Sequence, residues 1–363
     1  MAGKFHWKPF SAIDPNDPFF ETLKTDYPGN EYSREFGVWF REKVQANEKA
    51  LVYEDEQGIG AFISLKQEAD RVELQDGTAL PAVERTKIRT IKIGQRNQGQ
   101  RLGEGALGII LWHWQDTRRD QIYVTVFEKH TGLIALLEKF GFNMIGHNLN
   151  NECVFLKDRK YLDYTDPYKS FPFINPNFEN AGYIIINDYY HDTMFPYSEL
   201  KNTLQESVDL SVANGMCKIY VGTAFSMPHR VGEPVFIYRR YTKGPGAWFK
   251  SCLTSYCVIT DIIRPKVGGR YQMSFDDLLA RIGNKSVYNA NELRNQYQTA
   301  GTLNVIEMLY YGYFGEGHNI NMDWLQRNGY WPSEYPANAR LSPTQFKEIL
   351  SEANVHVENV IID

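Results

Sequence analysis

The chain has 363 residues, which is more than an ordinary single domain contains and favours two or three domains. Hydrophobic residues make up 43% of the sequence, aromatic residues 14% and charged residues 23%, a composition that excludes a disordered protein. The net charge of −5 excludes binding of nucleic acid or anionic membrane through bulk charge, so any such binding would need a local basic patch.

The first half of the chain alternates patterns that are typical of strands and helices. We expect the following elements in chain order: a helix over 36–44, strands over 50–54, 60–65 and 86–93, a helix over 104–117, a strand over 121–127 and a helix over 131–139. A basic loop that contains glycines separates the strand over 86–93 from the helix that follows. Gly141 ends the last helix, as glycine often does. This order predicts an α/β unit.

The second half is richer in short strands. Residues 158–180 contain three prolines and several turn-forming residues, and they predict a linker between domains at 1–157 and 181–363. Beyond it we expect strands over 182–187, 217–221, 234–241 and 255–263, with a helical stretch over 197–210. The last helix opens with Ser342, Pro343 and Gln345, which is a capping-box arrangement. We interpret this half as a small β-barrel with added helices.

The most informative segment is Ile91–Leu107, IKIGQRNQGQRLGEGAL. Closely spaced glycines between a strand and a helix let backbone N–H groups converge, and the helix N-terminus favours negative charge, so the segment suits a pyrophosphate. Residues 85–101 add six Lys or Arg and no Asp or Glu. The alternative is a turn with a solvated basic face, and the loop alone leaves both interpretations open.

The wider context resembles the acyl-CoA core of the GNAT superfamily of N-acetyltransferases, over about residues 7–157. The strand, loop and helix are followed by another strand and by the segment HTGLIALLEKFGF. The family's phosphate loop reads Q/R-x-x-G-x-G/A, and two registers fit it. Gln98–Gly103 has Arg101 at the central glycine, whereas Gln100–Gly105 matches to the letter but starts the helix two residues late. We favour the first register.

The resemblance implies a mixed, mostly antiparallel sheet with flanking helices, and acetyl-CoA as cosubstrate. It also implies that the strand backbone near Ile91 and Ile93 is splayed from the neighbouring strand and binds the pantetheine arm and the thioester. The cofactor-binding residues implied in this way are Ile91, Ile93, Gln98, Gly99, Gln100, Arg101, Leu102, Gly103, Glu104, Gly105 and His130. Leu137 stands where the family often has the Tyr that protonates the departing thiolate.

The general base has no obvious candidate, because no carboxylate lies within 86–93, where many members of the family carry a Glu. The remaining candidates are Glu84, Glu128 and His130. Each has an ordinary alternative, since Glu84 and Glu128 can be solvated loop carboxylates and His130 can be the N-cap-like residue of a short helix. Deprotonation through water would leave no trace in the sequence.

The second half resembles a PUA-like barrel of the ASCH or EVE type, through the segment Gly232–Tyr238. That resemblance implies RNA or a modified nucleotide as partner at residues 230–270, which hold eight basic and two acidic residues. Aromatic residues lie among them, including Tyr238, Tyr241, Trp248, Phe249 and Tyr256. Bases stack on such rings, although an ordinary barrel would use the rings as its core. The catalytic spacing of some ASCH hydrolases is missing, so we do not infer hydrolysis.

We expect no metal site, because Cys252 and Cys257 would point to opposite faces of one strand and no second pair lies nearby. The scattered cysteines exclude a disulfide scaffold and favour a reducing compartment. The longest strongly apolar stretch, residues 106–112, is too short to span a membrane, and the N-terminus lacks a signal-peptide core. We therefore expect a cytoplasmic protein with no membrane contact.

Together these features predict an acetyl-CoA-dependent N-acetyltransferase that acts on an amine of a nucleic-acid or nucleic-acid-linked substrate, delivered by the PUA-like domain. One alternative is an acetyltransferase for a protein or small-molecule amine. Another is a CoA- and RNA-binding protein without catalysis.

Overall fold

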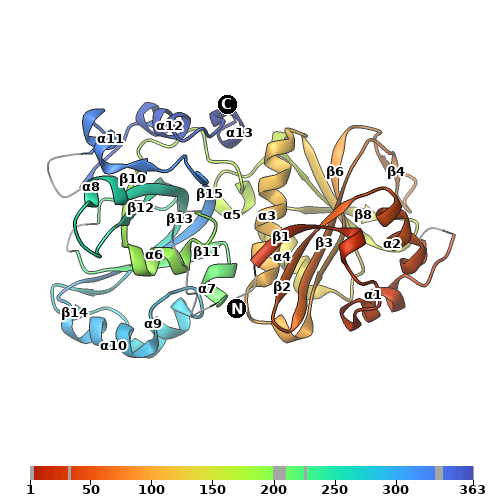
Figure 1. Cartoon of the computed structure of the whole chain (residues 1–363), viewed down its shortest axis with the longest axis horizontal. Helices are drawn as coiled ribbons and strands as arrows, with labels where there is room; N and C mark the ends of the chain where they lie inside the picture. Colours follow the sequence, from red (N-terminus) through yellow and green to blue (C-terminus); the bar gives the residue numbers. More distant parts are fainter. Residues whose placement is uncertain (1–3, 32–33, 199–209, 225–226, 332–337, 363) are drawn as a thin grey trace. The chain divides into compact units, whose positions relative to one another are not determined.

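The computed structural model describes residues 4–31, 34–198, 210–224, 227–331 and 338–362. The chain divides into two compact units, Met1–Leu162 and Asp163–Asp363 (Figure 1). The division falls inside the predicted linker. Most of that segment belongs to the second unit, where it forms α5 (Pro167–Ser170) and buries Phe171 and Phe173.

The first unit is built on a seven-stranded sheet in the order β1-β2-β3-β6-β7-β9-β8. The strands are β1 (Lys4–Pro9), β2 (Lys49–Asp55), β3 (Gly58–Glu68), β6 (Arg85–Ile93), β7 (Gln121–Val126), β8 (Asn143–His147) and β9 (Cys153–Asp158). A separate two-stranded sheet consists of β4 (Val72–Glu73) and β5 (Ala79–Leu80). Only the pair β6 and β7 is parallel in the large sheet of the described residues. The predicted mixed, mostly antiparallel sheet is therefore confirmed.

Helices flank this sheet, as predicted. They are α1 (Glu21–Asp26), α2 (Phe36–Gln45), α3 (Leu102–Thr117) and α4 (Thr131–Lys139), with short 3-10 turns η1 (Phe10–Ala12), η2 (Pro18–Phe20), η3 (Gln95–Asn97) and η4 (Arg159–Tyr161). The long helix α3 packs on β3 and β6 and buries most of its length, including Trp114. This burial explains why the helix is apolar on most of its faces.

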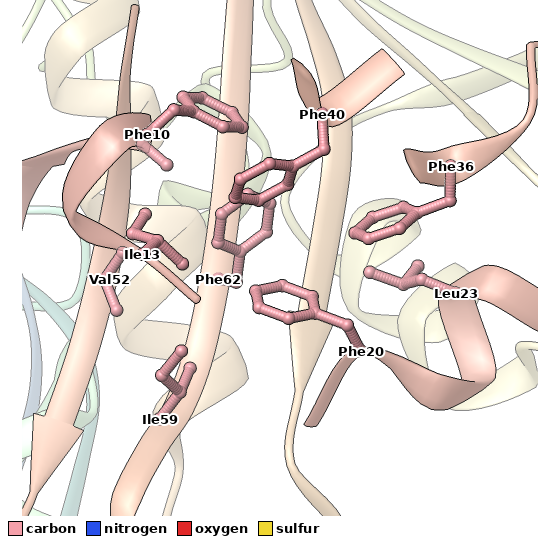
Figure 2. Close-up of a cluster of buried hydrophobic side chains, with 10 residues drawn as sticks. Phe10, Ile13, Phe20, Leu23, Phe36, Phe40, Val52, Ile59 and Phe62 are labelled. Atoms are coloured by element: carbon pink, nitrogen blue, oxygen red, sulfur yellow. The ribbon is translucent and has the colours of Figure 1, made fainter. Parts of the chain in front are cut away.

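An aromatic cluster fixes η2, α1 and α2 on the sheet (Figure 2). The Phe20 ring meets Phe62 of β3 edge to face, with centroids 5.1 Å apart, and Phe10 meets Phe62 in the same way at 5.7 Å. Phe36 and Phe40 of α2 complete the cluster. Each such ring pair contributes about 0.5–1.5 kcal/mol beyond its buried area. The cluster therefore holds rigidly the segment of η2 and α1 that also forms a wall of the site described below.

β6 and β7 pair only at their beginnings. Their parallel register runs from Arg85 opposite Gln121 to Ile88 opposite Val124. β6 then continues to Ile93 while paired with β3 alone, and a register shift opposite Arg89 bends it. The two strands therefore diverge toward their C-terminal ends, as the resemblance implied for the backbone near Ile91.

The second unit has its own seven-stranded sheet, in which β10-β12-β13-β15-β11 form the main path and β14 and β16 pair with β13. The strands are β10 (Gly182–Asn187), β11 (Cys217–Gly222), β12 (Pro234–Arg240), β13 (Cys252–Val267), β14 (Arg270–Tyr271), β15 (Leu303–Tyr313) and β16 (Ile320–Asn321). All four predicted strands are found. A closed barrel needs its two edges to pair, but no pairing joins β10 to β11 among the described residues. The described residues therefore show an open sheet, which bulges bend along β13, and do not show the predicted closed barrel.

Helices cover this sheet as well. They are α6 (Asp188–Met194), α7 (Leu210–Asn214), α8 (Ala247–Lys250), α9 (Phe275–Ile282), α10 (Ala290–Thr299), α11 (Met322–Arg327), α12 (Pro343–Glu352) and α13 (Val357–Val360). The predicted capping box of α12 is confirmed, with reciprocal bonds between Ser342 and Gln345 at 2.9 and 3.2 Å. Most of the helix predicted over 197–210 lies outside the described residues.

Candidate active site

The first unit contains an open cavity of about 1230 Å³ where β6 and β7 diverge. Its walls come from η2 and α1, the second half of β6, residues 94–99, the end of β7, and the first turns of α3 and α4. Small-molecule sites usually measure roughly 300–1,000 Å³, so this cavity has room for a long ligand.

The edge of β6 presents peptide groups to this cavity. Gly94 donates its N–H to the carbonyl of Gly60 at 2.8 Å. Opposed pairs in an antiparallel ladder alternate between bonded and non-bonded, so the register places Ile91 and Ile93 at non-bonded positions relative to β3. Their N–H and C=O groups therefore point toward the side from which β7 has diverged. An extended amide chain bound there would add to the sheet edge as a strand does.

The loop before α3 contains two residues with left-handed backbone. Gly99 and Arg101 both have positive φ, at 81° and 58°. α3 begins at Leu102, and its first intrahelical bond runs from Gly105 N–H to the carbonyl of Arg101. The N–H groups of Leu102–Glu104 thus have no acceptor within the helix, as at any helix N-terminus.

This geometry distinguishes the two registers of the loop. In the first, Arg101 occupies the glycine position, and its left-handed backbone is the one glycine adopts most easily. In the second, Gly105 should precede the helix, whereas it lies within the first turn of α3. The start of the helix agrees with the favoured register. Gly103 lines the cavity, and a Cβ there would meet Leu136 at 3.6 Å, which is ordinary contact.

Most of the basic charge near the loop is already paired. Arg89 forms an ion pair with Glu48, Arg96 with Asp55 at 2.8 Å, and Arg101 with Glu104 at 2.8 Å. The six basic residues of 85–101 therefore supply less free charge to an anion than their count indicates. The three paired arginines line the cavity, as does Lys92, but Lys92 donates to the hydroxyl of Thr22 rather than to a carboxylate. Burial lowers the pKa of Lys92.

Among the predicted bases, His130 lies on the cavity wall. It precedes α4, its side chain is 45% exposed, and its Nε2 lies 3.6 Å from Oδ2 of Asp26. Asp26 lines the same cavity from the end of α1 and is also held by Lys129. A carboxylate close to a basic side chain is a common arrangement for proton transfer. Sequence reasoning missed Asp26, which lies 103 positions before Lys129 and belongs to no motif.

The other two candidates lie elsewhere. Glu84 precedes β6 at the end opposite the cavity, roughly 17 Å from Arg89, the nearest lining residue of that strand, at the usual rise per strand residue. Its side chain is 74% exposed, and it pairs loosely with Arg119 at 3.5 Å. Glu128 follows β7, but its carboxylate contacts Nε2 of His147 at 3.0 Å and is not part of the cavity lining. The structure brings neither carboxylate to the cavity.

The expected position of a catalytic phenol is filled by a core residue. Leu137 is completely buried and does not line the cavity. A tyrosine does line it from another element: Tyr27 follows α1 and donates its hydroxyl to Glu152 at 2.9 Å. Burial, together with the nearby Glu152 charge, raises the pKa of Tyr27, so the phenol keeps its proton.

The predicted nucleic-acid segment of the second unit is divided between its interior and its surface. Arg239, Lys266, Tyr238 and Tyr256 are buried. Arg239 pairs with Asp192, and Lys266 donates to backbone carbonyls of α10. The interface predicted over 230–270 is therefore too broad, because these side chains hold the fold together.

Residues 240–250 of this segment are mostly exposed. Trp248 is 51% exposed and Phe249 69%, and the exposed residues Arg240, Lys243 and Lys250 lie close to them in sequence. The Lys250 ammonium lies 4.6 Å from the centroid of the Tyr241 ring. We call residues 240–250 the aromatic loop.

No protein-family model matches the sequence, and no curated protein matches it either. Among solved structures, NAA60 of Arabidopsis thaliana with acetyl-CoA is 13% identical over 44% of this chain and 100% of that chain, with a TM-score of 0.32. A GNAT family acetyltransferase of Elizabethkingia anophelis with acetyl-CoA bound is 14% identical over 43% of this chain and 98% of that chain, with a TM-score of 0.30. A mutant form of the ASCH protein of Zymomonas mobilis is 11% identical over 47% of this chain and 94% of that chain, with a TM-score of 0.32. With TM-scores below 0.5, these likenesses carry no conclusion about the activity of this chain.

Within the described ranges of the chain, no helix is both long enough and apolar enough to cross a membrane.

Proposed function

We propose that the first unit binds acetyl-CoA and transfers its acetyl group to an amine. The observation that carries this proposal is the pair of features at one cavity: the peptide edge of Ile91 and Ile93, and the N-terminus of α3. The edge suits the amides of a pantetheine arm, and the helix N-terminus suits a pyrophosphate. The loop residues Gln98–Gly105 are the proposed phosphate contacts.

The residues on the wall can supply the remaining chemistry. His130, whose Nε2 lies 3.6 Å from the Asp26 carboxylate, would take a proton from the incoming ammonium. The new bond forms between the amine nitrogen and the acetyl carbon, and the carbon–sulfur bond breaks. The N–H groups of the β6 edge would stabilise the oxyanion. The departing thiolate needs no dedicated phenol, because a thiol has a pKa near 8.5 and solvent can protonate it.

The test is acetyl-CoA binding by calorimetry in two variants of one residue. Gly103→Phe should place its ring in the cavity and abolish binding. Gly103→Ala should bind within a fewfold of the wild type, because its Cβ meets only ordinary contacts. Equal affinity of the wild type and the Phe variant would contradict the proposed site.

For the acceptor, we propose an amine on a nucleic acid or nucleic-acid-linked substrate, which the second unit binds through its aromatic loop. Exposed rings beside cations are the combination that unpaired bases stack on. A PUA-like, ASCH- or EVE-type relationship of the second unit is part of this proposal. It is supported by Gly232–Tyr238, where Gly232 has φ 83° and β12 follows. We also propose a cytoplasmic protein, in keeping with four free, buried cysteines.

The acceptor proposal is tested on the full chain with single-stranded RNA. Replacing Trp248 and Phe249 by Ala should weaken binding by at least about tenfold, since stacking contributes about 1–3 kcal/mol per base. Tyr161→Ala, an exposed ring of the first unit, is the control and should leave binding unchanged. Acetylation of peptides or small amines without RNA binding would support a protein or small-molecule acceptor instead. Tight acetyl-CoA binding without transfer to any amine would support a CoA-binding protein.

A further inference from the structure

Three side chains of the first unit converge outside the cavity. Glu128 follows β7, His147 ends β8, and Cys153 begins β9 directly opposite His147. Nε2 of His147 lies 3.0 Å from Oε1 of Glu128 and 3.6 Å from Sγ of Cys153. All three potential ligand atoms lie within 4.8 Å of one another.

Both contacts use the same ring nitrogen, which argues against a catalytic triad. In a triad, the carboxylate holds one imidazole nitrogen and the nucleophile contacts the other. A single Nε2 atom cannot donate to the Glu128 carboxylate and accept from the Cys153 thiol in the same tautomer. Hydrogen bonding therefore satisfies only one of the two contacts at a time. A cation, in contrast, accepts lone pairs from all three groups at once.

The two separations from His147 also suit a tetrahedral ion. With bonds of about 2.0 Å to nitrogen or oxygen and about 2.3 Å to sulfur, tetrahedral geometry separates the ligand atoms by roughly 3.3–3.5 Å. The observed 3.0 and 3.6 Å lie close to these values. A thiolate, an imidazole and a carboxylate together favour zinc over calcium or magnesium. One thiolate and one carboxylate would also balance the two charges of the ion.

We propose that Glu128, His147 and Cys153 bind one Zn²⁺ ion, with water at the fourth position. Cys153 is buried while Glu128 is 72% exposed, so the open position faces the solvent side of the cluster. The ion ties the turn between β7 and α4 to the β8–β9 hairpin. That turn carries Lys129 and His130 into the cavity, so the metal positions one wall of it. The expectation of no metal site considered only the cysteines of β13.

The experiment uses untagged full-length protein that has been treated with chelator and titrated with Co²⁺. The expected result is one ion per chain, with tetrahedral d–d bands and a thiolate-to-cobalt charge-transfer band in the near ultraviolet. Zn²⁺ should then displace the cobalt. Cys153→Ser should lose the charge-transfer band, and Cys252→Ser, which changes a buried cysteine of the other unit, should retain it.

Glu128→Gln provides a variant at an exposed position in case Cys153→Ser fails to fold. Its Zn²⁺ affinity, measured by competition with a chromophoric chelator, should fall by at least about 100-fold, since even the loss of an outer partner costs about 10–100-fold. Absence of the charge-transfer band in the wild type would overturn the proposal. Unchanged Zn²⁺ affinity in Glu128→Gln would remove Glu128 as a ligand and overturn the three-ligand site. These readouts do not depend on acetyl transfer.

Discussion

The pair of Asp192 and Arg239 allows a quantitative prediction for the second unit. Asp192 accepts from Nε and Nη2 of Arg239 at 2.7 and 2.9 Å, and its Oδ1 contacts Nδ1 of His191 at 2.9 Å. Burial alone would raise the pKa of Asp192, but the hydrogen bonds and charges of these partners lower it to about 2. Compared with the ordinary value of 3.8, the shift corresponds to about 2 kcal/mol of folding free energy.

Asp192→Asn removes this charge and keeps the shape of the side chain. Arg239, which is 7% exposed, is then left buried without its counter-charge. Removing one partner of a buried ion pair typically destabilises the fold by about 3–5 kcal/mol, so we expect the free energy of unfolding to fall by that amount near pH 7. Asp323→Asn breaks a surface pair with the exposed Arg327 and serves as the control, with an expected loss below about 1 kcal/mol.

The same pair predicts the pH dependence. Because the folded pKa of Asp192 is lower than the unfolded one, its contribution is present above about pH 4 and is lost as the pH falls toward 2. Burial also lowers the pKa of His191, so a further loss begins as the pH falls below about 6.5. Between pH 4 and pH 2 the free energy of unfolding should fall by about 2 kcal/mol less in Asp192→Asn than in the wild type.

The assay is hydrogen exchange resolved to peptides of β12 and β13, because the two units need not unfold together. It is run in a denaturant series at each pH. Two results would refute this reasoning. One is a decrease in the free energy of unfolding of less than about 1 kcal/mol for Asp192→Asn near pH 7, and the other is the same decrease in stability between pH 4 and 2 as in the wild type.

Three further predictions concern the first unit. His130→Ala should reduce acetyl transfer by about 10²–10⁴-fold while acetyl-CoA affinity, measured by calorimetry, changes less than about tenfold. Glu84→Gln should leave both quantities unchanged, because Glu84 lies at the far end of β6; a large loss of transfer there would show that the base is misassigned. Leu137→Tyr should lower the free energy of unfolding by about 1–3 kcal/mol in urea, because Leu137 is fully buried and the larger ring overpacks the core. Wild-type stability in that variant would mean that the phenol reaches the cavity.

The local elements were predictable from the sequence. Hydrophobic period, turn residues and caps placed α2, β2, β3, β6, α3, β7 and α4 of the first unit and the capping box of α12 close to their observed positions. The strands β1, β8 and β9 and the helix α1 were not predicted. The loop before α3 was also predictable, since a strand, closely spaced glycines and a helix follow each other directly. All of these signals act between residues a few positions apart.

The tertiary structure decided which side chains meet and which charges are free. Asp26 reaches His130 from α1, although the two are far apart in the sequence. Arg89 pairs with Glu48, the residue before β2, and Arg96 pairs with Asp55 of β2, although β3 lies between β2 and β6 in the sheet. The count of basic residues therefore overstated the charge open to a ligand. The cluster of Glu128, His147 and Cys153 exists only because three strand ends lie side by side. Periodicity reports which face of an element is buried, whereas a site depends on the register between elements, which distant contacts set.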